Sequence, residues 1–179
     1  HHRTASLDAA RVLVLGAGDI GRRVAAALEV FDAEVTLVAR RARDDIRSLD
    51  DVPGLLHTQD AVVIAVPLTP ATRHLVDAAF LAALPDGAAV VNVARGAVVD
   101  TAALLDELHR GRLRAFLDVT DPEPLPTDHP LWDAPNLLLT PHVGGGTTGW
   151  EQRAYRLAAE QLRRFLDHEP LRNVVDAGY

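Results

Sequence analysis

Three residue types are missing from the sequence: cysteine, methionine and lysine. Without cysteine the chain has no disulfides, no cysteine-ligated zinc or iron–sulfur cluster and no thiol nucleophile. Without lysine it has neither Schiff-base chemistry nor a phosphate-loop lysine, because all 18 basic residues are arginine. These absences exclude several classes of enzyme at once.

Long hydrophobic runs are also absent. The longest, such as 61–66 and 88–91, have the length of a strand, whereas a membrane helix needs about 20 apolar residues. The 18 basic and 25 acidic residues give a net charge of −7, without the basic character of a nucleic-acid-binding domain. We find no signal peptide. We therefore predict a cytoplasmic protein that binds neither nucleic acid nor membrane.

Size and composition are those of a globular domain. The 179 residues are 48% hydrophobic and 24% charged, enough for one core and too few for two full domains. The chain starts His1-His2-Arg3 without a methionine, which suggests a trimmed or recombinant fragment of a longer functional unit.

Strand-like and helical stretches alternate along the chain. Strands are predicted at 11–15, 34–38, 61–65, 88–93, 113–117 and 137–140, and helices at 20–31, 77–84, 101–110 and 147–168. The early strands are apolar at consecutive positions, as expected of parallel strands covered on both faces. We predict a Rossmann-like, doubly wound parallel α/β sheet in three αβα layers. Residues 1–10 form a linker or arm, 11–170 a dinucleotide-binding domain and 171–179 a tail.

A glycine-rich loop separates the first strand from the first helix. Its glycines follow the GxGxxG spacing, in which the first permits a tight turn, the second lets a pyrophosphate approach the backbone and the third lets helix and strand pack closely. The alternative is a glycine-rich turn without a ligand. We predict that the dinucleotide contacts Gly16, Gly18, Asp19, Ile20 and Gly21.

The end of the second strand predicts which nucleotide binds. An NAD site has an acidic residue about 20 residues past the loop, where it accepts hydrogen bonds from the ribose. Here Ala39 stands near that position, and Arg40 and Arg41 follow. Guanidinium groups can bind a 2′-phosphate in a bidentate manner, so NADP is favoured over NAD. Alternatively, the arginines form a solvated cluster and NAD binds without its acidic partner.

Three later segments carry charged or titratable side chains at the ends of strands. They are 91–96 with Arg95, 118–126 with Glu123 and 140–145 with His142. Open α/β sheets bind ligands at the carboxyl ends of their strands. We expect these three side chains to converge on one small anionic molecule.

The ordered motifs GxGxxG, VPLTPAT, VNVARGAVVD, DVTDPEPLP and TPHVGG resemble the cofactor-binding domain of the D-isomer-specific 2-hydroxyacid dehydrogenases, over about residues 7–179. In that family the cofactor domain is inserted into a split substrate domain. The N-terminal half of that second domain is not in this sequence. The segment 171–175 resembles the return of the chain into it.

The resemblance implies a role for each reactive residue. Arg95 would pair with the substrate carboxylate, as bidentate arginine geometry allows. His142 would be the general acid in ketone reduction and the general base in the reverse direction. Glu123 would hold the other imidazole nitrogen, and Asp118 would face the nicotinamide carboxamide. No metal is implied.

The resemblance also implies further contacts and an assembly. Trp132 in the proline-rich loop, together with the helix that follows, resembles the dimer contact of the family, so we expect a homodimer. Further cofactor contacts are expected at Val66, Pro67, Thr72, Val93, Ala94, Gly144 and Gly145, beside Arg95 and His142.

We therefore expect a domain of an oxidoreductase that transfers a hydride between NADP(H) or NAD(H) and a small D-2-hydroxy or 2-oxo acid. Without a substrate domain, the site stays open to water, whereas hydride transfer needs a closed site. We expect low activity from this chain alone. The alternatives are a non-catalytic module that senses a dinucleotide or binds proteins, and a purely structural Rossmann domain.

Overall fold

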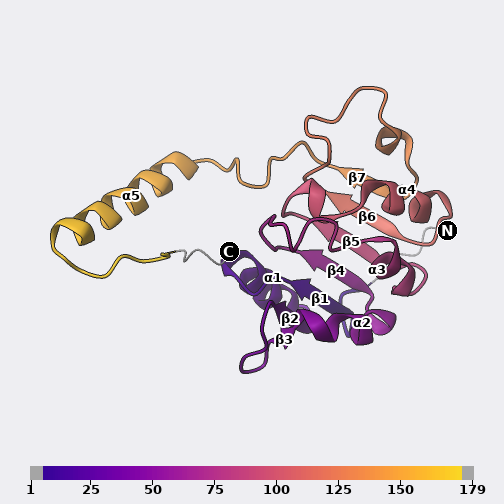
Figure 1. Cartoon of the computed structure of the whole chain (residues 1–179), viewed down its shortest axis with the longest axis horizontal. Helices are drawn as coiled ribbons and strands as arrows, with labels where there is room; N and C mark the ends of the chain where they lie inside the picture. Colours follow the sequence, from indigo (N-terminus) through magenta and orange to yellow (C-terminus); the bar gives the residue numbers. More distant parts are fainter. Residues whose placement is uncertain (1–5, 175–179) are drawn as a thin grey trace. The chain divides into compact units, whose positions relative to one another are not determined.

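The computed structural model describes residues 6–174, so residues 1–5 of the predicted arm and 175–179 of the predicted tail lie outside the described part. Its centre is a seven-stranded sheet in the order β3-β2-β1-β4-β5-β6-β7 (Figure 1). All neighbouring strands are parallel. The strands are β1 (Arg11–Leu15), β2 (Glu34–Ala39), β3 (Arg47–Ser48), β4 (Ala61–Ile64), β5 (Ala89–Asn92), β6 (Arg114–Leu117) and β7 (Leu137–Leu139).

The described residues 6–174 contain five α-helices. They are α1 (Asp19–Glu29), α2 (Val52–Leu55), α3 (Ala78–Ala83), α4 (Thr101–His109) and α5 (Trp150–Leu166). The predicted α/β fold is confirmed, with all six predicted strands and all four predicted helices. The two-residue strand β3 and the single-turn helix α2 were not predicted. No helix in residues 6–174 is long and apolar enough to cross a membrane.

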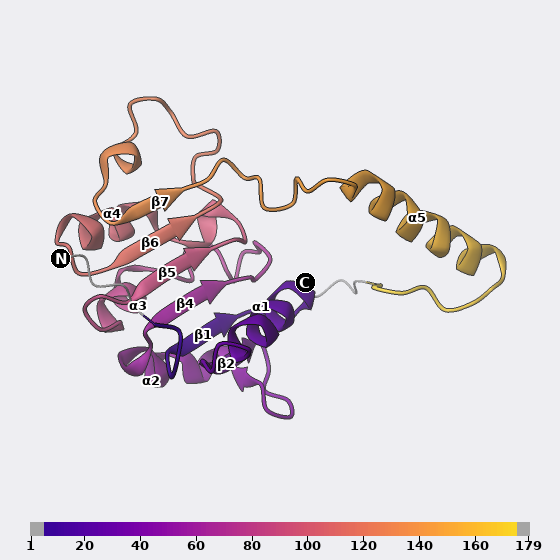
Figure 2. The same ribbon diagram turned by 180° about the vertical axis from the view of Figure 1, so that it is seen from behind.

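Helices cover the sheet on both faces, as the two views in Figure 1 and Figure 2 show. Alternate residues of a strand point to opposite faces. Leu13 and Leu15 therefore join the cluster formed with α2, α3 and α4, whereas Val12 and Val14 join the cluster formed with α1. This alternation produces the predicted three layers.

The face that carries α1 is less covered at β6 and β7. Phe116 pairs with Val91 of β5 and with Leu138 of β7, so the three side chains share one face. Val91 packs into the α1 cluster, but Phe116 is 40% and Leu138 is 56% exposed. The described chain leaves an apolar strip of sheet in contact with solvent.

The chain consists of two compact units, one ending at Pro141 and the other beginning at His142. The second unit contains α5. At the end of α5, Arg163 pairs with Asp167 at 2.8 Å and with Glu169 at 3.0 Å. The hydrogen bond from Arg163 holds the pKa of the Glu169 carboxyl below its usual value. None of the residues of α5 is buried, and its large apolar side chains, such as Trp150, Leu162 and Phe165, are exposed.

A buried ion pair joins α3 to α4 in the first unit. Arg112 Nε lies 2.5 Å from Glu107 Oε2, and the Glu107 side chain is only 7% exposed. The guanidinium also donates to the carbonyl oxygens of Leu84, at 2.6 Å, and of Leu81. Arg112 thus caps the end of α3 and neutralises a buried carboxylate of α4.

Removing the arginine tests how much this pair contributes to stability. We expect Arg112→Ala to lower the free energy of unfolding, measured by urea denaturation, by about 3 kcal/mol, because the buried Glu107 carboxylate loses its partner at 2.5 Å and keeps only the exposed Arg110 at 3.5 Å. Arg110→Ala is the matched control, because Arg110 approaches the same carboxylate at 3.5 Å from a 67% exposed position. The control should change stability by less than about 0.5 kcal/mol. Equal losses in both variants would contradict this assignment.

Candidate functional site at the carboxyl edge of the sheet

The glycine loop connects β1 to α1 in a conformation that two of its glycines require. Gly16 has a φ of +111°, and a Cβ atom there would lie 2.5 Å from the carbonyl oxygen of Ala65. A Cβ atom at Gly21 would lie 1.7 Å from the carbonyl oxygen of Gly16. Packing within the chain therefore explains these two glycines.

Gly18 differs, because a Cβ atom there would meet nothing within 4 Å. Gly18 is also the N-cap of α1, and no side chain caps that helix end. The first-turn N–H groups and the positive end of the helix dipole favour an anion at such a position. Packing within the chain gives no reason for glycine at position 18, whereas a pyrophosphate lying against the backbone does, so the loop fits a dinucleotide.

Asp19 and Ile20, the other predicted contacts in this loop, begin α1. The Asp19 carboxylate pairs with Arg23 Nε at 3.0 Å across one turn of the helix. Ile20 is 57% exposed although it is apolar. Its exposed position beside the loop is consistent with the predicted cofactor contact.

Alanine substitutions separate the two roles of the glycines. Gly18→Ala should leave the thermal midpoint within about 2 °C of wild type, since the methyl group enters open space. The same change should weaken dinucleotide binding about tenfold or more, because the methyl group keeps the pyrophosphate from the backbone.

Gly21→Ala is the matched comparison, and we expect it to lower the thermal midpoint because α1 must move away from the loop. Differential scanning fluorimetry and calorimetric titration measure the two effects. A Gly18→Ala variant that binds dinucleotide as wild type does would contradict a pyrophosphate at this position.

The end of β2 carries no carboxylate. Strand β2 ends at Ala39, and the exposed Arg40 and Arg41 follow. The next residues form a small closed loop, in which Arg43 and Ile46 exchange backbone hydrogen bonds of 3.1 and 2.8 Å. Strand β3 then pairs with β2 and places the exposed Arg47 beside Val38. A strand of two residues is too short to show a periodic pattern, so the sequence does not predict the proximity of Arg47.

The loop after β4 contains the predicted contacts Val66, Pro67 and Thr72. Val66 is 9% and Thr72 is 8% exposed. The Thr72 hydroxyl donates to the carbonyl oxygen of Pro67 at 2.6 Å and accepts from the backbone N–H of Thr69 at 2.8 Å. Thr72 therefore maintains the shape of the loop. Of the three predicted contacts, Pro67 is the one that is exposed.

Arg95 lies in the turn after β5 and its side chain is exposed. Its Nη1 donates to the carbonyl oxygen of Ala94 at 2.6 Å. Ala94 is 7% exposed, and Val93 is 39% exposed. The turn therefore presents a guanidinium group above a packed backbone, which suits a clamp for a small carboxylate.

The proline-rich loop that carries Glu123 packs directly against this turn. A Cβ atom at Gly96 would lie 1.9 Å from the carbonyl oxygen of Thr120. The Thr101 hydroxyl also donates to the carbonyl oxygen of Asp121 at 3.2 Å. The exposed Glu123 follows, between the cis peptides Asp121–Pro122 and Glu123–Pro124. The structure thus brings together the two loops that carry Arg95 and Glu123.

Asp118, at the end of β6, bonds to its neighbours on both sides. Its Oδ1 accepts from the Thr140 hydroxyl at 2.5 Å. Its backbone N–H donates to the carbonyl oxygen of Asn92 at 3.0 Å. Asp118 therefore connects the ends of β5 and β7.

His142 is the first residue of the second unit. It is exposed and has a φ of +53°, a left-handed conformation that is uncommon outside glycine. Gly144 and Gly145 follow it and are exposed. The predicted convergence of His142 with Arg95 and Glu123 stays a prediction.

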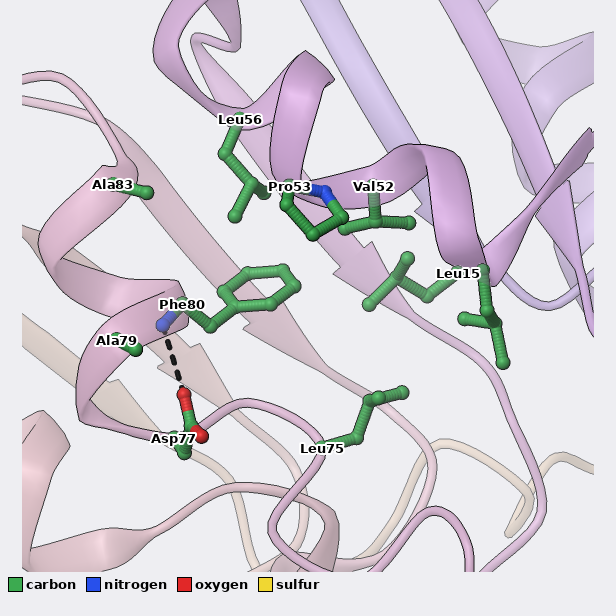
Figure 3. A pocket seen from close by; sticks show the side chains of 10 residues that line it. Leu15, Val52, Pro53, Leu56, Leu75, Asp77, Ala79, Phe80 and Ala83 are labelled. Carbon is green, nitrogen blue, oxygen red and sulfur yellow. Dashed lines mark hydrogen bonds between the residues drawn. The ribbon is translucent and has the colours of Figure 1, made fainter.

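An apolar pocket of about 300 Å³ lies elsewhere, between α2 and α3 (Figure 3). Phe80 points into it toward Val52 and Pro53, and the Asp77 carboxylate caps α3 by accepting from the Phe80 N–H at 2.8 Å. None of the predicted site residues lines this pocket. Across residues 6–174, no group of three or more acidic or histidine side chains is placed to hold a metal ion.

A parallel sheet with a GxGxxG loop at its first strand–helix turn defines an α/β domain of the dinucleotide-binding class. Residues 1–144 match the family described as "D-isomer specific 2-hydroxyacid dehydrogenase, NAD binding domain". The chain belongs to this family, as the sequence motifs predicted.

Individual relatives agree with this assignment. The chain is 37% identical over 163 residues to a glyoxylate reductase of Thermofilum pendens, covering 87% of this chain and 48% of that protein. It is 34% identical over 170 residues to a D-3-phosphoglycerate dehydrogenase of Methanocaldococcus jannaschii, covering 91% of this chain and 32% of the relative. The chain thus spans less than half the length of either relative.

Among solved structures, a D-isomer specific 2-hydroxyacid dehydrogenase from Xanthobacter autotrophicus Py2, crystallised with NADPH and MES, is similar to this chain. The TM-score is 0.88 at 39% identity, and the match covers 98% of this chain and 75% of the other. The relationship is therefore one of sequence as well as of fold.

Proposed function

We propose that this chain is the nucleotide-binding part of an enzyme that transfers a hydride between NADP(H) or NAD(H) and a small D-2-hydroxy or 2-oxo acid. The observation that carries the proposal is the packing of the Arg95 turn against the Glu123 loop at the carboxyl edge of the sheet. The open position at Gly18 and the uncapped end of α1 support a dinucleotide at the same edge. The relatives named as a glyoxylate reductase and a phosphoglycerate dehydrogenase support the substrate class.

In this proposal the nicotinamide, when bound, donates or accepts the hydride. Arg95 binds the substrate carboxylate through two N–H groups and so orients the 2-oxo group. His142 as imidazolium donates a proton to the carbonyl oxygen as negative charge develops there, and removes it in the reverse direction. Glu123 accepts a hydrogen bond from the other imidazole nitrogen, which fixes the ring orientation and favours the imidazolium.

We propose NADP(H) as the preferred nucleotide. Support comes from Ala39 at the end of β2, from the exposed Arg40 and Arg41 that follow it, and from the NADPH named in the complex of the Xanthobacter relative. A carboxylate at position 39 would repel a 2′-phosphate, whereas a guanidinium group attracts it. The remaining predicted nucleotide contacts, such as Val93 and Ala94, lie beside Arg95 in the turn after β5.

Calorimetric titration with NADPH and then NADH tests the preference. We expect NADPH to bind more tightly, and Arg40→Ala to weaken NADPH binding about tenfold while leaving NADH unchanged, because one charge-assisted hydrogen bond is lost. Arg110→Ala, at the residue just after α4, is the control for a general loss of positive charge. Tighter binding of NADH by wild type would contradict the preference and leave the family assignment intact.

The chain spans less than half the length of the two relatives named above. The turnover of this chain alone therefore needs its own proposal. We propose that it binds nucleotide but reduces glyoxylate slowly, because water enters a site that no second domain closes. The rate of NADPH oxidation is followed at 340 nm. A typical enzyme turns over about 10 times per second, and we expect the turnover rate of this chain to be at least about 100-fold lower. A rate in the usual range would contradict the need for further chain.

We also propose a homodimer and a division of the chain into arm (1–10), dinucleotide-binding domain (11–170) and tail (171–179). Trp132 is 55% exposed although its Nε1 donates to the carbonyl oxygen of Pro126 at 2.7 Å. Together with the exposed Phe116 and Leu138, it supports an interface between two copies. We further propose that the protein is cytoplasmic.

A further inference from the structure

We propose that Asn92 is a positioning residue for Arg95, and that both halves of its amide are needed to direct the guanidinium group toward a substrate carboxylate. The inference rests on the proposed function, because it assumes that Arg95 is the carboxylate clamp. Asn92 is the last residue of β5, and its side chain has only 1% exposure.

Both the oxygen and the nitrogen of the Asn92 amide form hydrogen bonds to the turn that carries Arg95. Its Oδ1 accepts from the backbone N–H of Ala94 at 3.0 Å. Its Nδ2 donates to the carbonyl oxygen of Arg95, also at 3.0 Å. The same carbonyl oxygen accepts from the Val98 N–H at 3.1 Å. One side chain therefore holds the Val93–Ala94 peptide group and the Arg95–Gly96 peptide group, which lie on either side of the Ala94–Arg95 peptide.

The first of these bonds is an ordinary turn contact, which Asp or Ser can also supply. The second needs an N–H donor at that position, and among residues of similar size only an amide supplies a donor and an acceptor on two separate atoms. Aspartate would turn a carboxylate oxygen toward the Arg95 carbonyl oxygen and leave that contact repulsive. The requirement for asparagine therefore comes from the bond to Arg95 itself.

Asn92 also connects this turn to the next strand. Its backbone carbonyl oxygen accepts from the Asp118 N–H at 3.0 Å, and Asp118 starts the loop that leads to Glu123. The direction of the Arg95 side chain is thus set relative to the end of β6. Bidentate recognition of a carboxylate tolerates errors of only about 0.5 Å, so a small rotation of the Arg95 peptide changes binding strongly.

The test follows Arg95 directly by NMR spectroscopy. The ¹⁵N-labelled chain, saturated with NADPH, is titrated with oxalate as an unreactive carboxylate, and the Nε–Hε signal of Arg95 is recorded. We expect a saturable shift in wild type. In Asn92→Asp, oxalate affinity should fall about tenfold, because one of two charge-assisted bonds is lost, while NADPH affinity stays within about twofold of wild type.

Two further variants make the result specific. Asn136→Asp makes the same chemical change at an exposed position just before β7. This position lies at the amino ends of the strands, away from Arg95 at the carboxyl ends, so the change should leave oxalate binding unchanged. Asn92→Ser keeps an acceptor for the Ala94 N–H, but its single hydroxyl leaves no second atom at the position of Nδ2 to donate to the Arg95 carbonyl oxygen. It should weaken oxalate binding while slow hydrogen exchange at Ala94 is retained, and it decides the question if Asn92→Asp does not fold.

Three outcomes would overturn the inference. Wild-type oxalate affinity and an unchanged Arg95 signal in both Asn92 variants would show that the amide does not direct the guanidinium group. Equal losses of NADPH and oxalate affinity would show that Asn92 only holds the fold together. A wild-type chain whose Arg95 signal ignores oxalate, but which binds NADPH, would refute the clamp role of Arg95 and the inference with it.

Discussion

Every feature of the candidate site depends on the parallel pairing of the strands. Because β1, β4, β5, β6 and β7 all run in the same direction, the segments that follow them emerge at one edge of the sheet. Residues far apart in sequence, such as Gly18, Arg95 and Asp118, are thereby gathered at this edge. An antiparallel neighbour would send one of these segments to the opposite edge.

The sequence predicts the sheet well because its strands are apolar at consecutive positions and are separated by helices with a regular period. Strand β3 and helix α2 cannot be predicted from periodicity, because two residues and a single helical turn are too short to show a period. Their formation depends on tertiary contacts, such as the burial of Ile46 and Val52 at 3% and 4% exposure. The predicted and observed ends of the other strands differ by a residue or two, because the ends also depend on tertiary contacts.

The site is predictable to different degrees. The glycine spacing predicts the loop conformation, and the structure adds that packing requires Gly16 and Gly21 whereas Gly18 faces open space. Thr72 is predicted to contact the cofactor, and the structure adds that its hydroxyl bonds within its own loop. Asn92 has no predicted role, because an asparagine at a strand end resembles any turn residue until its two bonds to the Arg95 turn are seen.

The close contact of Gly96 with Thr120 has a consequence for how such a site changes over time. The turn with Arg95 and the loop with Glu123 are in backbone-to-backbone contact at Gly96, so a side chain at position 96 would separate them. Neither segment can drift in sequence or length without the other. We therefore expect a change of substrate to come from residues that border this pair, because a change within the pair disturbs both segments at once.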